Sequence, residues 1–151
     1  MAAARTERGN NQVSGTYFDV WWDEELLFET SKLEAKVILE REEVQLDIDV
    51  DTKYTKAKGE GTLVIKMFYT RGMDKYLEAY KAGKDPRGTI ISKVKDPDTP
   101  GGQEERVKIG NVWLNELILA MYERGTPAER EIPFGFTPKD ASFFSTIEKL
   151  S

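Results

Sequence analysis

Apolar and polar residues alternate with a period of two through most of this chain, which predicts a protein built mainly of β-strands. The clearest run covers 44–53, where apolar or β-branched side chains at even positions alternate with polar side chains at odd positions. We expect a single strand there, with one apolar and one acidic face. Residues 53–61 are polar and end in a Gly-Glu-Gly segment, and they predict a turn or mobile loop. Further strands are predicted at 17–22, 26–30, 33–39, 62–69, 87–94, 106–114 and 131–137.

One segment breaks this alternation and predicts a helix at about 72–83. From Met73 to Tyr80, large apolar residues recur at the spacing i, i+3, i+4 and i+7, which forms one stripe on a helix. Gly83 can end the helix in a left-handed conformation, and Pro86 cannot continue it. The expected fold class is therefore mainly β, a β-barrel or sandwich with one flanking α-helix.

Three features of the C-terminal third bear on the fold. Residues 114–121 include apolar positions at helical spacing, yet a turn followed by a buried strand over 117–122 fits the same residues. Pro133 places the last predicted strand at a sheet edge or makes it the start of a strand. Residues 140–150 predict a short amphipathic turn.

The composition fits one soluble globular domain and excludes many kinds of active site. The chain has 151 residues, of which 39% are hydrophobic and 32% charged. It has no cysteine and no histidine, so disulfides, thiol nucleophiles, histidine acid–base catalysis and the usual zinc sites are excluded. We expect no catalytic residue, no metal, no cofactor and no membrane anchor. The small, polar residues 1–12 are expected to form an N-terminal arm before a single domain over 13–151.

Charge is unevenly distributed along the chain. Residues 40–51 hold six carboxylates against one arginine, a net of −5, whereas residues 52–95 hold eleven basic and four acidic residues, a net of +7. The whole chain carries −5, which argues against tight nucleic-acid binding. Such separation of charge suits contacts between copies of the same chain.

The run Asp47, Asp49 and Asp51 begins like a calcium-binding loop. Such a loop requires glycine at its sixth position and glutamate at its twelfth, and here those positions are Thr52 and Lys58. A solvated strand face is the better interpretation, and no metal site is predicted there.

The order of these segments resembles the tail tube proteins of contractile-tailed phages and of phage-tail-like bacteriocins. The resemblance covers about residues 12 to 147 and depends on the order and spacing of several short segments rather than on any one of them. Those segments are VSG at 13–15, LEAKV at 33–37, GEGT at 59–62, LEAYKAGKDP at 77–86, ERVKI at 105–109 and EIPFGF at 131–136. The resemblance favours a strand at 117–122.

This resemblance implies a structural protein rather than an enzyme. Members of the family form hexameric rings whose inner strands join into one barrel, and the rings stack into a helical tube. The implied partners are further copies, the tail sheath protein, and baseplate and tail terminator proteins, with tape measure protein and DNA transiently in the bore. The implied location is the tail tube of a virion or a tail-like particle, assembled in the bacterial host cytoplasm. The tube would conduct DNA during ejection or puncture a target.

Two groups of residues are expected to make the assembly contacts. Residues 44–61 are expected to form a long hairpin or loop that becomes ordered between rings. Its contact residues would be Val44, Leu46, Ile48, Val50 and Tyr54. Candidates for the sheath-facing surface lie on and just after the helix, and they are Lys75, Lys81, Lys84, Asp85 and Arg87. An acidic bore is expected, because it would repel duplex DNA instead of holding it.

Two other classes of function remain open from the residues. One is a monomeric small β-barrel that carries a ligand in a cavity lined by Trp21, Trp22 and Trp113. The other is a hydrolase that uses a pair of carboxylates. A ligand carrier would stay monomeric, whereas a tube protein would form rings or hollow rods.

Overall fold

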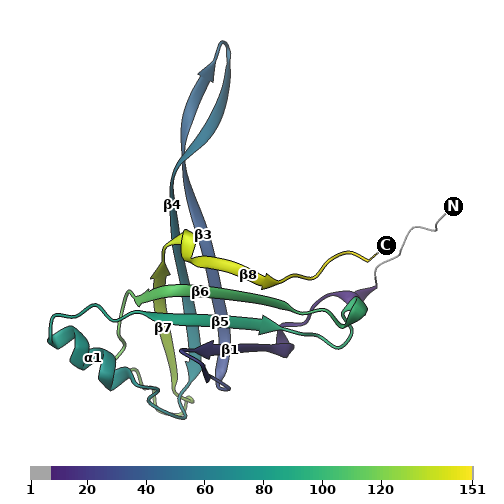
Figure 1. The fold of residues 1–151 in the computed structure, drawn as a ribbon. Coiled ribbons are helices and arrows are strands. Elements are labelled where there is room, and N and C mark those ends of the chain that lie inside the picture. The colour runs from purple at the N-terminus through teal and green to yellow at the C-terminus, as the bar shows by residue number, and fades with distance from the viewer. Residues whose placement is uncertain (1–7, 151) are drawn as a thin grey trace.

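The computed structural model describes residues 8–150, and this part of the chain folds into eight strands and one α-helix (Figure 1). The strands are β1 (Phe18–Trp22), β2 (Glu25–Leu26), β3 (Thr30–Leu46), β4 (Asp49–Lys66), β5 (Gly88–Val94), β6 (Glu105–Leu114), β7 (Glu129–Phe136) and β8 (Ala141–Ser145). The helix is α1 (Met73–Lys81), and short 3-10 turns lie at Gly9–Asn11, Gly15–Tyr17, Pro100–Gly102 and Pro138–Asp140. The prediction of a mainly β fold with a flanking helix is confirmed. Of the predicted arm over 1–12, residues 1–7 lie outside the described residues.

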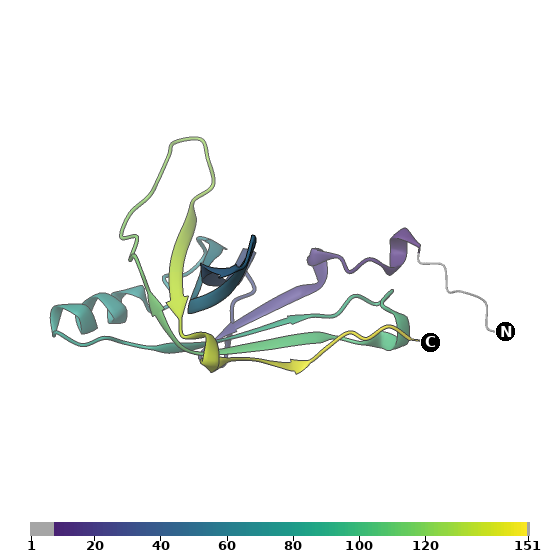
Figure 2. The ribbon, with the colours of Figure 1, turned by 90° about the horizontal axis from the view of Figure 1, so that it is seen from above.

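The strands are antiparallel and form two layers that share β6. Their order is β2-β1-β5-β6-β7-β4-β3, and β8 also pairs with β6. Most of β6 pairs with β5 and β8, whereas its last two residues, Trp113 and Leu114, pair with β7. Figures 1 and 2 show β3, β4 and β7 crossing β1, β5 and β6 steeply. A strand that passes from one layer to the other makes the corner of an orthogonal β-sandwich.

The core lies between these layers and is closed by close contacts at glycines. Its buried apolar residues are Val20, Leu27, Leu63, Ile65, Ile90, Ile109, Val112, Leu114, Ile132, Phe134 and Phe136. On β4, a Cβ atom at Gly61 would lie 2.5 Å from the ring of Phe134, and one at Gly59 would lie 2.5 Å from the ring of Phe136. Glycine is therefore required for the two phenylalanine rings of β7 to pack against β4.

The helix forms where its apolar stripe predicted it. Gly72 and Gly83, both with φ of 77°, flank it, and the Gly83 N–H donates to the Tyr80 carbonyl. Tyr76 packs against the core, and its hydroxyl accepts a hydrogen bond from Trp22 Nε1 at 3.0 Å. Burial is the main reason that the pKa of Tyr76 rises to about 12. Among residues 8–150, no helix is long and apolar enough to cross a membrane.

The predicted single strand over 44–53 is wrong, because the chain reverses at Asp47 and Ile48. Leu46 pairs with Asp49 across this two-residue turn, and Asp47 adopts a φ of 51°. Directly paired residues of an antiparallel ladder point to the same face. Val44 and Leu46 therefore share a face with Asp49 and Asp51, and Val50 lies on the opposite face.

The predicted turn or loop over 53–61 is also wrong, because these residues belong to β4. They pair with β3 from Lys53, opposite Glu42, to Gly61, opposite Ala35. Opposite charges face each other in several of these pairs, such as Glu40 with Lys56. A strand exposed on both faces needs no apolar alternation, so the sequence pattern did not reveal it.

Three expectations for the C-terminal third fail. Residues 115–128 form a long open connection between β6 and β7 (Figure 2), so the strand predicted at 117–122 is wrong. Within the described part of the chain, no strand pairs with them. Residues 141–145 form β8 on β6 instead of an amphipathic turn. Pro133 is inside β7, between β4 and β6. The missing N–H of Pro133 is tolerated because β6 has already ended at Leu114, so no ladder hydrogen bond is lost. The Pro133 carbonyl accepts a hydrogen bond from the N–H of Asn115, the residue after β6.

Candidate assembly interfaces

The outer part of the β3–β4 hairpin, residues 37–58, projects away from the sandwich, and we call it the outer hairpin (Figure 1). β4 pairs with β7 only from Gly59 onward, so the outer hairpin is a ribbon of two strands. All of its residues are exposed. An isolated two-stranded ribbon is marginally stable in water, and a contiguous exposed apolar surface usually marks a binding site. The outer hairpin is therefore the first candidate interface.

All five predicted inter-subunit residues lie in the outer hairpin, but they do not share one face. Val44 and Leu46 lie on one face, and Val50 and Tyr54 lie on the other. Ile48 is at the tip and is 97% exposed. A ribbon with apolar side chains on both faces can bury them only if other chains cover both sides.

The charges that the sequence separates lie in order along this hairpin. Asp47, Asp49 and Asp51 are at or next to the tip, and Lys53, Lys56 and Lys58 follow toward the sandwich. Within residues 8–150, no group of three or more aspartate or glutamate residues is arranged to hold a metal ion. Because Glu42 and Glu40 lie opposite Lys53 and Lys56, the tip is an acidic and apolar end on a stem of mixed charge.

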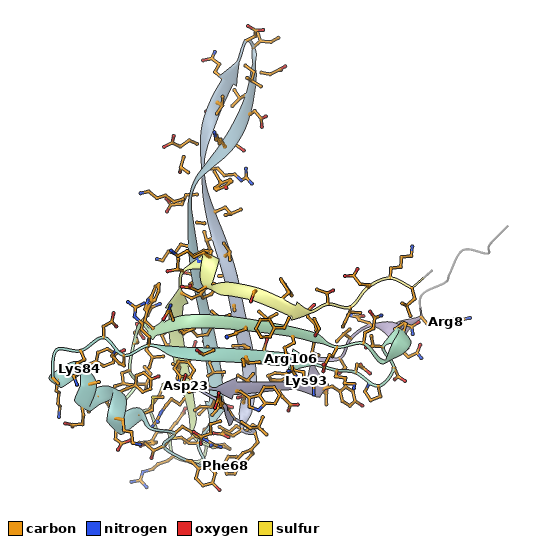
Figure 3. The ribbon with its side chains drawn as sticks, in the orientation of Figure 1. Arg8, Asp23, Phe68, Lys84, Lys93 and Arg106 are labelled. Atoms are coloured by element: carbon orange, nitrogen blue, oxygen red, sulfur yellow. The ribbon has the colours of Figure 1, made fainter. Side chains whose placement is uncertain are left out.

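An exposed group of aromatic residues lies at the opposite end of the sandwich, where Figure 3 labels Phe68. We call Phe28, Phe68 and Tyr69 the aromatic platform. The ring of Phe28 is 5.7 Å from that of Phe68 and 6.1 Å from that of Tyr69, centre to centre. The three residues are 60%, 65% and 59% exposed, in that order. The three rings contact one another more than they contact the core. Together they form an apolar surface that faces solvent.

Arg71 holds this platform in place. Its guanidinium carbon lies 5.5 Å from the ring centre of Phe28 and 5.1 Å from that of Tyr69. Its Nε and Nη2 donate to the two carboxylate oxygens of Glu29 at 2.6 and 2.9 Å, and its Nη1 donates to Glu25. This bidentate geometry, together with a φ of 55° at Arg71, fixes the loop after β4.

Glu29 is the buried partner in this arrangement, with a side chain that is 0% exposed. Burial by itself would raise the pKa of Glu29. The hydrogen bonds from Arg71 and from the backbone, with the positive charge of Arg71, outweigh burial and lower this pKa below its ordinary value of 4.5. Glu29 is therefore ionised at neutral pH.

Sequence reasoning missed the platform and its ion pair. Phe28 and Glu29 are about forty residues from Phe68, Tyr69 and Arg71 in the chain, and only the fold brings them together. The one local signal was a pair of aromatic residues directly after the last apolar run of β4.

The predicted sheath-facing residues lie exposed on and after α1, near the Lys84 label in Figure 3. Asp85 and Arg87 pair with each other at 2.6 Å, and the Arg87 guanidinium stacks 4.7 Å from the ring centre of Trp113. Lys81 lies 3.5 Å from Glu78. Lys75 and Lys84 form no ion pair with the rest of residues 8–150, so they are the charges most available to a partner.

Two further apolar surfaces lie on the flank of the sandwich. The connection over 115–128 exposes Leu119, Met121 and Tyr122, each more than half. On β8, Phe143 and Phe144 are 64% and 59% exposed. The surface on β8 was not singled out as a contact site from the sequence.

The tryptophans do not line a shared cavity, as a ligand carrier would require. Trp22 packs edge-on against Tyr76, and the Trp113 ring packs against Gly135 and Arg87. One groove, of about 430 Å³, is open and is lined by residues that include Phe18, Leu33 and Val94. No tryptophan is among its lining residues.

Comparison with known proteins gives a family and a fold. A family model described as phage tail tube protein matches residues 5–141. No curated protein matches the chain. Among solved structures, the tube-terminating cap of the anti-feeding prophage aligns with a TM-score of 0.73 at 9% identity, covering 96% of this chain and 97% of that one.

Two further structures come from an extracellular contractile injection system named PVC. A chain of its sheath–tube complex in the extended state gives a TM-score of 0.69 at 9% identity, covering 89% of this chain and 93% of that one. A chain of its sheath/tube terminator gives 0.68 at 10% identity, covering 89% and 96%. At these identities the similarity shows a shared fold.

Proposed function

The chain belongs to the phage tail tube protein family, a family of structural proteins and not of enzymes, and on this basis we propose how it assembles. Six copies form a ring, and rings stack into the inner tube of a contractile tail or tail-like particle. The tube conducts DNA during ejection, or punctures the target in a particle without DNA. Its partners are a sheath, a baseplate and a terminator, as the names of the structurally similar chains support.

The observation that carries this proposal is the outer hairpin. It exposes apolar side chains on both faces and at its tip, and β7 does not reach it. Contacts with copies in the same ring and in the next ring would bury those side chains. Within residues 8–150, no strand pairs with the outer edge of β3 along 30–46, and such an edge is a template for pairing with another chain. Pairing at this edge would join neighbouring sheets around a ring.

The variant Ile48→Asp tests this role directly. A charge at the tip should abolish tubes seen by negative-stain microscopy and leave the monomer folded, because Ile48 makes no core contact. Phe144→Asp is the matched control, since it adds the same charge in place of an exposed apolar side chain outside the outer hairpin. Tubes of normal length and yield from Ile48→Asp would overturn the proposal.

For the sheath contact we propose the exposed charges of α1 and the residues after it. Lys75 and Lys84 carry the contact, supported by Lys81 and by the Asp85–Arg87 pair. A sheath must release the tube, and exposed charge pairs are individually worth only about 0–1 kcal/mol. The triple variant Lys75→Glu, Lys81→Glu, Lys84→Glu should form normal tubes that recruit little sheath. Full sheath recruitment by those tubes would exclude this surface.

For the bore we propose a wall that is acidic on balance, with tape measure protein and DNA passing through it transiently. The net charge of −5 supports it. An acidic wall makes no salt-sensitive phosphate contacts that would retain the duplex. Clear retention of duplex DNA by assembled tubes at physiological salt would contradict it.

A further inference from the structure

We propose that the aromatic platform is the receiving site for the tip of the outer hairpin of a second copy in the adjacent ring. This inference rests on the proposed stacking of rings and names the surface that the tip contacts. It assigns a role to Phe28, Phe68 and Tyr69, which the fold leaves exposed.

The tip and the platform lie at the two ends of one strand. β4 begins at Asp49, next to Ile48, and ends at Lys66, two residues before Phe68. Its 18 residues span about 60 Å at about 3.3 Å per residue. Figures 1 and 3 show the tip and Phe68 at opposite ends of the molecule. A surface whose complement lies at the far end of the same molecule makes a head-to-tail contact, which is repeated in an open stack and does not close on two copies.

The chemistry of the two ends is complementary. The tip presents Ile48, 97% exposed, between the carboxylates of Asp47 and Asp49. The platform presents three exposed rings, with the exposed Lys66 close by in the chain at the end of β4. The charge of Arg71, stacked on two of the rings, is already paired with Glu29 and Glu25. Ile48 would be buried against the rings, and the two aspartates would approach Lys66. The other exposed aromatic pair, on β8, lies on the flank of the sandwich (Figure 1).

The platform is also preorganised for binding. Phe28 and Tyr69 are held by the guanidinium of Arg71, which the buried Glu29 fixes through two hydrogen bonds. Side chains that are ordered before docking lose less entropy when the partner arrives. The buried ion pair therefore acts as a positioning element, and the rings make the contact.

The absence of cysteine allows a direct test by cross-linking. The double variant Ile48→Cys/Phe68→Cys is assembled into tubes, treated with a short bis-maleimide, and analysed on a denaturing gel. Each copy offers one tip and one platform, so the expected result is a ladder from dimer to long chains. The matched control is Ile48→Cys/Phe144→Cys, which places the second thiol on an aromatic residue of similar exposure on β8. The control should give at least tenfold less ladder.

The outcomes separate this inference from the proposed function. Tubes that give no more ladder than the control overturn the platform as the receiving site and leave the tube function standing. A product that stops at the dimer also overturns it, because a head-to-tail contact must continue. If the wild-type chain forms no tubes, both proposals fail. The single variants Phe68→Cys and Tyr69→Cys give a second readout. If they lose tubes but keep a folded monomer, while Phe144→Cys assembles normally, the result supports the site.

Discussion

The two halves of β4 occupy different environments. Residues 59–66 lie between β3 and β7, and Leu63 and Ile65 are each 1% exposed. Residues 49–58 pair with β3 alone, and every one of them is exposed. One strand thus belongs both to the core of a single chain and to a surface that other chains can cover. Under the proposed function, folding and assembly use different stretches of the same element.

The sequence of each half reflects this division. The inner half places glycines where the rings of Phe134 and Phe136 approach the backbone, and then alternates apolar residues toward the core. The outer half places charged residues opposite one another and apolar residues on both faces. Substitutions in the inner half should therefore affect stability, and substitutions in the outer half should affect assembly.

The largest expected contrast is between Phe134→Ala and Tyr54→Ala. Phe134 is fully buried, and its truncation should lower the free energy of unfolding by about 4 kcal/mol through lost burial and a cavity. Tyr54 is 59% exposed, so its truncation should change that free energy by less than about 0.5 kcal/mol. Urea unfolding of the dissociated chains measures both. Equal losses would show that the outer hairpin is part of the cooperative fold.

A somewhat smaller loss is expected from Glu29→Gln. Removing one partner of a buried ion pair typically costs on the order of 3 kcal/mol, and here it leaves Arg71 with only the exposed Glu25. Glu25→Gln is the control and should have a small effect.

This interaction should also depend on pH. The folded-state pKa of Glu29 is lowered, so its contribution is complete above the ordinary value of 4.5 and is lost as the pH falls through the lowered pKa. The wild-type chain should therefore lose more stability than Glu29→Gln as the pH falls below 4.5. Parallel pH profiles for the two proteins would contradict the role of Glu29.

The smallest of these effects is expected at Gly61. The Cβ of Gly61→Ala would lie 2.5 Å from the Phe134 ring and closer still to the backbone carbonyl oxygen of Glu34 on β3, and the resulting overpacking should cost about 2 kcal/mol. Ala57→Val also enlarges a side chain on β4, but in the exposed outer half, and should cost less than about 0.5 kcal/mol. Thermal unfolding of the two variants compares the cost of enlarging an apolar side chain in the inner and in the outer half of β4. A neutral Gly61→Ala would mean that both β3 and the Phe134 ring can move away from this position of β4.

Much of the fold could be predicted because the spacing of apolar residues along the chain follows which side chains are buried. The strands of the sandwich and α1 have one face against the core, and their apolar spacing shows it. The turn at Asp47 and Ile48 was hidden, because a two-residue turn keeps even positions apolar while the chain reverses. The connection over 115–128 was hidden, since apolar residues in an open loop have the spacing of either a strand or a helix.

The candidate interfaces could be predicted only in part. Exposed apolar residues in an alternating run, such as Leu46 and Val50, were visible as contact candidates in the sequence. Their division between two faces depends on the register of the hairpin. The platform depends on tertiary contacts between Phe28, Tyr69 and Arg71, which no local pattern encodes.

We propose that the outer hairpin is a contact between copies and is not part of the stable fold of one chain. Amide hydrogen exchange, compared between dissociated chains and assembled tubes, tests it most directly. We predict rapid exchange over residues 37–58 in dissociated chains, slow exchange of residues 59–66 in both states, and strong protection of 37–58 in tubes. Equal exchange of 37–58 in the two states would contradict the claim.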